Sequence, residues 1–303
     1  VRVDVAVIEV GLGGRFDATN IVEPLACAIT TIGLDHEEYL GRTLEAIAFE
    51  KAGIIKSGVP VVMGRIAPEA ARVIRNVAVQ RDAPLWSLGK DFETKGSGPD
   101  HFIYYGPRWM IDALSCNLAG QHQLDNAACA IALLEAATRS GLSVGNDAIR
   151  RGLRSVVWEG RLELLDGAPR LLLDGAHNPA AALTLARYLE EFHRSHPGSA
   201  VILIWGMMRD KDHRAFIAPL LPLVSEIVVT QAGLARSAEI KTLRAVLAEW
   251  PHPVWEAPSS VDALRLAKER AAARDLVCVT GSLMLLGDVK ASLRGAGPTV
   301  LRG

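Results

Sequence analysis

Residues 7–20 read VIEVGLGGRFDATN, an apolar run that passes directly into a glycine-rich turn. Two shorter polar clusters follow, GLDH at residues 33–36 and EKAGI at residues 50–54. Open α/β sheets bind their ligands at the carboxyl ends of successive strands. A carboxylate, an imidazole and a lysine in this order therefore indicate one ion-binding site at the edge of such a sheet.

Around these clusters, apolar runs of strand length alternate with segments of helical periodicity. The first part of the chain predicts strands at 3–10, 26–32 and 59–63, with helices at 43–51 and 68–81. This alternation is typical of a mostly parallel sheet in an α/β fold. If the first two strands are parallel neighbours, Glu9 and His36 emerge at the same edge.

A different pattern follows. Aromatic and β-branched residues around a Gly106-Pro107 turn predict an antiparallel hairpin at 101–114. A long buried helix is predicted at 123–140 and a shorter one at 146–154. The first domain is therefore an α/β core with a β appendage.

A second α/β alternation begins near residue 160, where we place a domain boundary between residues 1–159 and 160–303. Strands are predicted at 170–173, 200–205, 227–230 and 276–280. Helices are predicted at 179–194, 240–249 and 261–274.

The composition indicates a globular protein and excludes several classes. The chain has 303 residues, half of them hydrophobic, with a formal net charge of -1. The absence of long runs of one sign argues against a nucleic-acid or membrane surface. No apolar run approaches the roughly 20 residues that span a bilayer, and no export signal opens the sequence. The four cysteines lie one by one in apolar contexts, with no CxxC pair, which predicts buried thiols and a cytoplasmic location. They are Cys27, Cys116, Cys129 and Cys278.

The glycine-rich turn does not match a dinucleotide fingerprint, because the GxGxxG spacing requires glycine where Phe16 stands. Glu9 is a carboxylate in an apolar run, which is costly to bury unless an ion or a donor compensates it. His36, taken alone, could be an ordinary loop histidine with no ligand to bind. Lys51 is also explained by an exposed ion pair with Glu50.

In the second half, LLLDGAHNP at residues 171–179 is the most specific local motif. An apolar strand ends on an acid and turns through glycine, and Asn178 and Pro179 suit the N-cap and first position of a helix. Capping does not explain Asp174 and His177. Both are well placed to hold hydroxyls and phosphates of a nucleotide at the helix N-terminus.

These motifs, together with GMMRDKD at 206–212 and TGSL at 280–283, closely resemble the folylpolyglutamate synthase/dihydrofolate synthase family of the Mur ligase superfamily. They occur in matching order over nearly the whole chain. The resemblance implies a doubly wound ATPase-type central domain that binds ATP, magnesium and folate. A smaller Rossmann-like α/β domain, the glutamate-ligase domain, would follow it.

The resemblance implies an ADP-forming ligase that joins L-glutamate to dihydropteroate, to the γ-carboxylate of a folate, or to both. ATP would phosphorylate the acceptor carboxylate, and the amine of glutamate would attack the acyl phosphate. The implied cofactors are ATP and Mg²⁺, and the partners are these small molecules, with no nucleic acid and no membrane. We expect a monomer when the protein is full length.

The resemblance also assigns roles to single residues. Glu9 and His36 would be magnesium ligands, and Lys51 would be a carbamylated lysine that supplies an oxygen ligand as the third member of the set and serves catalysis. His177 would act catalytically near the nucleotide or the incoming glutamate. The remaining assignments are Phe16, Asp17 and Ala18 for the pterin substrate, and Asn126, Arg161 and Asp174 for ATP. For Arg161, an ion pair with Glu159 or Glu163 is the structural alternative.

One departure stands against these matches. The phosphate-binding motif GxxxxGK[ST] of the family is not found; Gly89-Lys90-Asp91 lacks its first glycine and its hydroxyl. Because the chain begins with Val1, we expect this loop to precede it in the native protein and the chain alone to be inactive. A non-catalytic binding module and a different Mur-type amino-acid ligase are the alternatives, although the pterin-contact run argues against the second.

Overall fold

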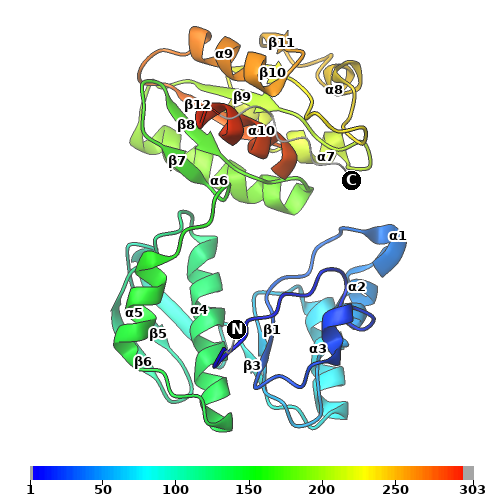
Figure 1. Ribbon diagram of the computed structural model, residues 1–303, viewed down its shortest axis with the longest axis vertical. Helices are drawn as coiled ribbons and strands as arrows, with labels where there is room; N and C mark the ends of the chain where they lie inside the picture. Colours follow the sequence, from blue (N-terminus) through cyan, green and yellow to red (C-terminus); the bar gives the residue numbers. More distant parts are fainter. Residues whose placement is uncertain (1–2, 296–303) are drawn as a thin grey trace. The chain divides into compact units, whose positions relative to one another are not determined.

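The computed structural model describes residues 3–295. The chain divides into two compact units (Figure 1): unit 1 comprises Val1–Asn117 and Gln121–Val156, and unit 2 comprises Leu118–Gly120 and Val157–Gly303. Among the described residues, no helix combines the length and the apolar character needed to cross a bilayer.

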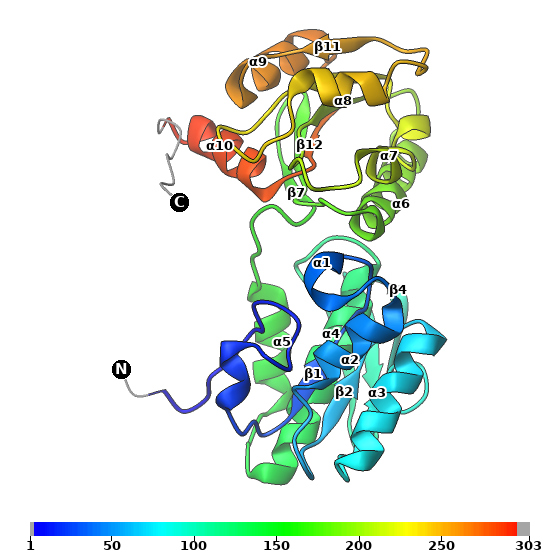
Figure 2. The same cartoon turned by 90° about the vertical axis from the view of Figure 1, so that its right-hand side faces the viewer.

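Unit 1 is built on a three-stranded parallel sheet of order β1-β2-β3. Helices α2 and α3 lie side by side on one face of it (Figure 2), and their small apolar residues Ala48, Ala52 and Ala70 pack against Ile29 and Met63. Helix α4 packs on β1 and β2 and also contacts a second sheet. The bounds are β1 Cys27–Ile29, β2 Val61–Met63, β3 Leu85–Ser87, α2 Leu44–Ala52, α3 Pro68–Gln80 and α4 His122–Ala137.

The second sheet of unit 1 is antiparallel, of order β4-β5-β6. The predicted hairpin is confirmed as β5 and β6, and β4 adds a third strand that the sequence did not predict because its residues are mostly glycine and polar. Fully buried Glu135 on α4 fixes the hairpin turn: it accepts hydrogen bonds from the Tyr104 hydroxyl (2.9 Å) and the Arg108 amide (2.6 Å). The bounds are β4 Glu93–Gly98, β5 His101–Tyr105, β6 Met110–Leu114, η2 Thr138–Ser140 and α5 Asn146–Ser155.

The predicted strand at 3–10 is wrong. Within the described chain this segment pairs with no strand, and residues 3–9 are exposed, with Val7 at 96%. An apolar run becomes a strand only where a neighbouring strand satisfies its backbone groups and a packed face covers its side chains. Glu9 therefore stands in an extended loop and not at a strand end.

Unit 2 is a six-stranded sheet of order β11-β10-β9-β12-β8-β7. All neighbours are parallel except β7, which pairs antiparallel with β8. The sequence predicted the four central strands and missed the short edge strands. The bounds are β7 Glu163–Leu165, β8 Arg170–Leu173, β9 Val201–Trp205, β10 Glu226–Val229, β11 Val254–Glu256 and β12 Leu276–Thr280.

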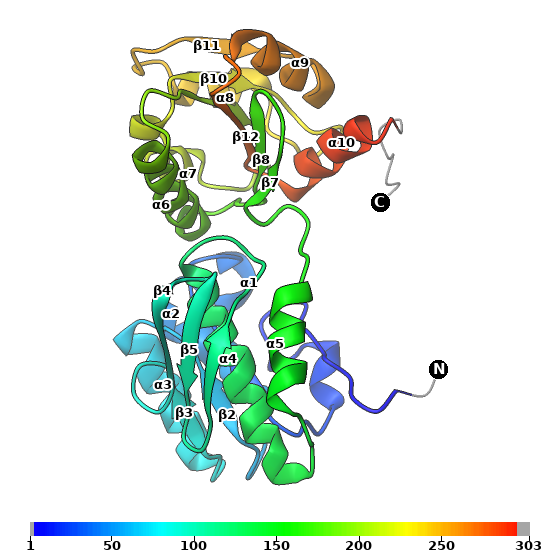
Figure 3. The same cartoon turned by 90° about the vertical axis from the view of Figure 1, so that its left-hand side faces the viewer.

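Both faces of this sheet are covered, as a doubly wound fold requires. Figure 3 shows α6 and α7 on one side of β8 and β12 and α10 on the other. The first core gathers around Trp205, Leu172 and Phe216, and the second around Leu173, Ile204 and Leu285. The bounds are α6 Pro179–Ser195, α7 His213–Ile217, η3 Leu221–Leu223, α8 Ile240–Val246, α9 Ser260–Arg270 and α10 Leu283–Leu293.

All four cysteines are free and buried, so the prediction of buried thiols is confirmed. Burial raises the pKa of the Cys27 thiol to about 12, which makes a reactive thiolate unfavourable.

Candidate functional site

The glycine-rich turn of unit 1 lies against the C-terminal end of α2. The Arg15 amide donates to the carbonyl oxygen of Glu50 (2.8 Å). A Cβ at Gly14 would lie 2.9 Å from the Ile54 side chain and 3.0 Å from the carbonyl oxygens of both Glu50 and Lys51, so a larger residue would push the loop away from α2. The loop that carries the predicted pterin contacts is thereby fixed next to the predicted metal-binding lysine.

Asn20 closes the same loop. Its side-chain amide donates to the carbonyl oxygens of Arg15 (3.0 Å) and Gly53 (3.1 Å), and the Lys56 ammonium donates to the Asn20 carbonyl oxygen (2.7 Å). The bonds of Asn20 with Gly53 and Lys56 join residues that are more than thirty positions apart. The loop is therefore held by tertiary contacts as well as by its own turn.

Asp17 organises the loop from within. Its carboxylate accepts hydrogen bonds from the Thr19 hydroxyl (2.6 Å), the Thr19 amide (2.9 Å) and the Leu12 amide (2.9 Å), and it caps the short helix η1, Ala18–Ile21. The Thr19 hydroxyl, followed by the backbone amides, lowers the pKa of Asp17 to about 2. The neighbouring residues Phe16 and Ala18 are exposed.

The three predicted metal ligands lie on separate segments of unit 1. Glu9 is exposed in the extended loop, and His36 caps the short helix α1, Glu37–Leu40, in a left-handed conformation with φ 51°. Lys51 lies in the last turn of α2. No ion pair joins Glu9 to His36 or Lys51, and residues 3–295 contain no cluster of three His, Cys, Asp or Glu side chains suited to a metal ion.

The ion pair that sequence proximity offered to Lys51 does not form. Both carboxylate oxygens of Glu50 bind Arg15 instead, at 2.8 Å from Nη2 and 3.2 Å from Nε. Within the described chain, the Lys51 ammonium takes part in no hydrogen bond or ion pair. Its amine is therefore not neutralised by a protein carboxylate.

Asn126 lies in the second turn of α4, and its side-chain amide donates to Gln123 Oε1 (2.9 Å). This bond uses only the amide nitrogen. The carboxamide oxygen of the exposed Asn126 side chain can therefore accept a hydrogen bond from a ligand. Arg65 anchors the same helical turn through a bidentate pair with Asp125 (2.7 and 3.0 Å).

In unit 2, Asp174 follows β8 and is 7% exposed. Its carboxylate accepts hydrogen bonds from the amides of Leu162 (2.9 Å) and Ala176 (3.0 Å), so it ties the turn after β8 to the segment before β7. Such bonds compensate the burial of a charged group. Asp174 therefore has a structural task besides any ligand contact.

His177 and Asn178 open helix α6. Asn178 is the N-cap, as predicted, and accepts from the Ala181 amide (2.9 Å). His177 Nδ1 lies 2.9 Å from the Gly175 carbonyl oxygen. Because a carbonyl oxygen only accepts, Nδ1 carries the proton, and Nε2 is the basic nitrogen of the neutral ring.

Three loops meet at the carboxyl edge of the unit 2 sheet, after β8, β9 and β12. The Gly281 amide donates to the Ala176 carbonyl oxygen (2.9 Å), and the Gly206 amide donates to that of Thr280 (3.3 Å). Gly281 has φ +105°, and a Cβ there would lie 2.6 Å from the Gly206 carbonyl oxygen. Since the chain leaves neighbouring β8 and β12 toward opposite faces, this is the switch point where α/β sheets bind ligands.

Arg161 does not form the ion pair considered as its structural alternative. Glu159 pairs with Lys290 (3.0 Å) and Arg294 (2.7 Å), and Glu163 pairs with Lys290 (2.7 Å). The guanidinium of Arg161 is exposed and has no ion pair among residues 3–295. It is therefore available to an anion.

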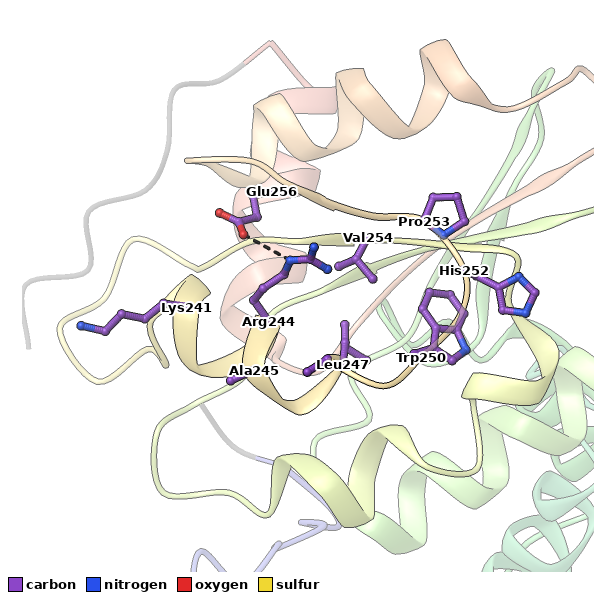
Figure 4. A pocket seen from close by; sticks show the side chains of 10 residues that line it. Lys241, Arg244, Ala245, Leu247, Trp250, His252, Pro253, Val254 and Glu256 are labelled. Atoms are coloured by element: carbon purple, nitrogen blue, oxygen red, sulfur yellow. Dashed lines mark ion pairs between the residues drawn. The ribbon is translucent and has the colours of Figure 1, made fainter.

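A hollow in unit 2 lies between α8 and β11 (Figure 4), and its cationic side chains are already paired with carboxylates. Arg244 pairs with Glu256 (3.5 Å), and Lys241 pairs with Glu239 (2.7 Å). The hollow therefore offers an anion no uncompensated charge. Its lining residues are Lys241, Arg244, Ala245, Leu247, Ala248, Trp250, His252, Pro253, Val254 and Glu256.

Comparison with known proteins agrees with this arrangement. Residues 1–134 match the Mur ligase middle domain, and residues 160–283 match the Mur ligase glutamate ligase domain. The dihydrofolate synthase/folylpolyglutamate synthase of Bacillus subtilis is 33% identical over 299 residues, which cover 97% of this chain and 68% of that protein. The chain belongs to the folylpolyglutamate synthase/dihydrofolate synthase family. The resemblance inferred from the motifs is confirmed.

Solved structures of this family share the fold. The Mycobacterium tuberculosis folylpolyglutamate synthase complexed with ADP and AMPPCP superimposes with a TM-score of 0.87 at 32% identity, covering 98% of this chain and 70% of that one. Escherichia coli FolC in complex with DHPP and ADP gives 0.85 at 32% identity, over 94% and 65% of the two chains. The predicted α/β fold with Mur ligase middle and C-terminal domains is confirmed.

The family members differ in how much of their length this chain spans. The chain covers about two thirds of the B. subtilis protein but 35% of the Halobacterium salinarum probable bifunctional folylpolyglutamate synthase/dihydropteroate synthase. The comparisons thus establish the family and the fold of these 303 residues.

Sequence reasoning about this family site missed the pairing of Arg15 with Glu50. The two residues are 35 positions apart, and no spacing or periodicity relates them. The arginine directly after two glycines in a turn is the one local signal that could have drawn attention to it.

Proposed function

We propose that this chain takes part in the ATP-dependent ligation of L-glutamate to dihydropteroate, to the γ-carboxylate of a folate, or to both. The family match, which extends through the glycine-rich loop and covers 97% of the chain, carries the proposal. Relatives with solved structures hold DHPP and ADP, or Mn, AMPPNP and L-glutamate. Residues 1–159 would bind ATP, metal and folate, and residues 160–303 would form the glutamate-ligase domain.

The chemistry explains why ATP is needed. A carboxylate oxygen is too poor a leaving group for an amine to displace, so the γ-phosphoryl group is first transferred to it and ADP is released. The glutamate amine then attacks the acyl carbon and a C–N bond forms. The C–O bond to phosphate breaks, phosphate leaves with the electron pair, and the amine gives up a proton.

For the metal, the donor set fits a hard divalent cation if Lys51 is carbamylated. A neutral lysine amine adds to carbon dioxide, forms an N–C bond and releases a proton, which gives a carbamate whose oxygens suit magnesium. The Lys51 amine is suited to this reaction because Arg15 occupies the adjacent Glu50. Glu9, His36 and carbamylated Lys51 would hold Mg²⁺, which offsets charge on the phosphate oxygens when bound.

For ATP, we propose three contacting residues, Asn126, Arg161 and Asp174. In unit 1 the carboxamide of Asn126 would bind the nucleotide. In unit 2 the exposed Arg161 guanidinium would pair with phosphate oxygens, since this residue has no ion pair in the described chain. Asp174 would contact ATP from the turn that follows β8.

His177 is proposed as a catalytic residue close to the nucleotide or the incoming glutamate. Proton transfer from the attacking amine requires a base, and Nε2 of the neutral ring is the basic nitrogen when Nδ1 bonds to Gly175.

The pterin substrate would be bound by the loop residues Phe16, Asp17 and Ala18. Exposed Phe16 offers a flat apolar surface, and Asp17 offers a carboxylate with a low pKa. We further propose a cytoplasmic, monomeric protein that binds neither nucleic acid nor a membrane, in keeping with its free buried cysteines.

The test is glutamate-dependent ADP release with dihydropteroate or tetrahydrofolate as acceptor. It should be run on the 303-residue protein and on the protein with whatever upstream sequence its gene encodes. In whichever of these two forms turns over, Lys51→Ala should abolish turnover and the matched surface variant Lys268→Ala should leave it unchanged. Carbon-13 bicarbonate should give a carbamate signal that Lys51→Ala lacks.

Other results would change the assignment. Binding of ATP and pterin substrate without turnover in either protein would favour a non-catalytic binding module. Turnover with a cell-wall nucleotide precursor and no pterin substrate would favour a different Mur-type ligase.

A further inference from the structure

Arg15 joins the glycine-rich loop to α2 through both its side chain and its backbone. Its guanidinium binds both carboxylate oxygens of Glu50, and its amide donates to the Glu50 carbonyl oxygen (2.8 Å). Its own carbonyl oxygen accepts from the Asn20 side chain (3.0 Å). Backbone and side chain are thus both fixed to α2.

The fixed guanidinium also contacts two aromatic rings. Its Cζ lies 4.2 Å from the Phe16 ring centroid and 5.0 Å from that of Phe49. A cation over the face of an aromatic ring is attracted to it, and the planar guanidinium can stack there while it binds a carboxylate. Arg15 therefore connects α2 to an aromatic side chain of the loop.

Phe16 is an unusual side chain to hold in this way, because it is 82% exposed. An exposed phenylalanine gains nothing from burial in the core, and binding a ligand with a mobile side chain costs the entropy of ordering it. With one ring face against Arg15, the exposed remainder of the ring is already oriented.

We propose that Arg15 is a positioning residue: held by Glu50, it orients the Phe16 ring for stacking on the flat pterin ring of the substrate. This inference rests on the proposed function, which supplies the pterin substrate. Phe49, which is 48% exposed, gives the guanidinium a second aromatic contact at 5.0 Å and so helps to hold Arg15 in place. In this role Arg15 acts through Phe16 and not on the reacting atoms.

Unit 2 contains a matched arrangement without a predicted substrate. Arg270 binds Glu226 through two nitrogens, and its Cζ lies 3.8 Å from the ring centroid of Trp255. The Trp255 indole N–H also donates to Glu226 (2.8 Å). This cluster joins the end of α9 to edge strand β11, so its role is structural. Arg270→Lys makes the same chemical change as Arg15→Lys and therefore serves as its control.

The experiment compares Arg15→Lys with Arg270→Lys in the complete protein. Lysine keeps the charge and loses the bidentate pair and the planar stack. We expect Arg15→Lys to raise KM for the pterin substrate by about three- to tenfold, with KM for ATP and kcat changed less than twofold. Arg270→Lys should change none of the three. Direct titration with the pterin substrate should show the same loss of affinity.

A second pair of variants separates positioning from general loop damage. In a Phe16→Leu background, which removes the aromatic ring, Arg15→Lys should have no further effect on pterin affinity. Additive effects of the two substitutions would overturn the inference, as would an unchanged KM for the pterin substrate in Arg15→Lys. An equal loss of ATP and pterin affinity would also overturn it.

Assays of the unmodified protein separate a failure of the role of Arg15 from a failure of the proposed function. Turnover by the unmodified protein together with a normal Arg15→Lys variant overturns the role of Arg15 and leaves the proposed function intact. Absence of both turnover and pterin binding in the unmodified protein overturns the proposed function, and the inference with it.

Discussion

The segment VDVAVIEV at residues 3–10 and the segment RLLLD at residues 170–174 have the same pattern, an apolar run that contains or ends on an acid. The structure gives them opposite fates. Leu172 is fully buried in β8, whereas Val7 is 96% exposed in an extended loop. Strand β8 lies between β12 and β7 with helices over both faces, and within the described chain segment 3–10 has no pairing strand.

The acids of the two segments differ in the same way. Asp174 is buried and bound by two backbone amides, while Glu9 is exposed. The difference shows that an apolar run with an acid does not by itself make a strand with a functional carboxylate at its end. Neighbouring strands and donors decide whether either forms.

Proline substitution should separate the two segments most strongly. Leu172→Pro is expected to prevent unit 2 from folding, because Leu172 is paired with strands on both sides and proline removes a ladder N–H. Val7→Pro should leave stability unchanged. Circular dichroism during thermal unfolding measures both, and a large loss in Val7→Pro would mean that segment 3–10 is paired in solution.

Removal of apolar side chains should give the next largest difference. Leu172→Ala should lower the free energy of unfolding by about 2–5 kcal/mol, because it leaves a cavity in a packed core. Val7→Ala should change it by less than about 0.5 kcal/mol. Urea denaturation followed by tryptophan fluorescence provides the values, and equal losses would show that the comparison is mistaken.

Loss of the acids should have a smaller effect. Asp174→Ala leaves the amides of Leu162 and Ala176 without their acceptor, which should destabilise unit 2 by about 1–3 kcal/mol. Asp174→Asn keeps one acceptor oxygen and should lose less. Glu9→Ala should stay within about 0.5 kcal/mol. A stable Asp174→Ala protein in denaturant titrations would argue that this carboxylate serves a ligand alone.

The smallest expected effect concerns the glycine-rich loop that continues segment 3–10. The folded pKa of Asp17, about 2, lies below its ordinary value of 3.8. Its hydrogen bonds therefore stabilise the loop fully above pH 3.8 and are lost as pH falls through about 2. NMR titration of the Asp17 carboxyl should give this midpoint, and Thr19→Ala should raise it. A midpoint near 3.8 in the unmodified protein would contradict the loop geometry.

Elements whose patterns are long and strongly periodic could be predicted from the sequence. Helices α3 and α6 carry proline in the first turn and begin at the predicted residues, and the hairpin of β5 and β6 follows its Gly106-Pro107 turn. The edge strands β7 and β11 have three residues each, too few to show an alternation. Short edges depend on the neighbouring strand more than on their own residues.

The candidate site divides in a similar way. The motif after β8 predicted the N-cap Asn178, because a cap and its helix are adjacent in sequence. The bidentate pairing of Glu50 with Arg15 leaves Lys51 with no carboxylate partner among residues 3–295. This pairing could not be predicted, because adjacent residues on a helix do not face each other and Arg15 belongs to another segment.

The sequence by itself determined the family, the α/β alternation and the residue types available to the site, since these depend on local patterns and motif spacing. Only the tertiary structure decided which apolar run became a strand, which carboxylate was bound and which cation stayed unpaired. Pairing partners, packed faces and hydrogen-bond donors come from distant parts of the chain, and a buried polar group or an unpaired backbone is stable only where those parts meet it.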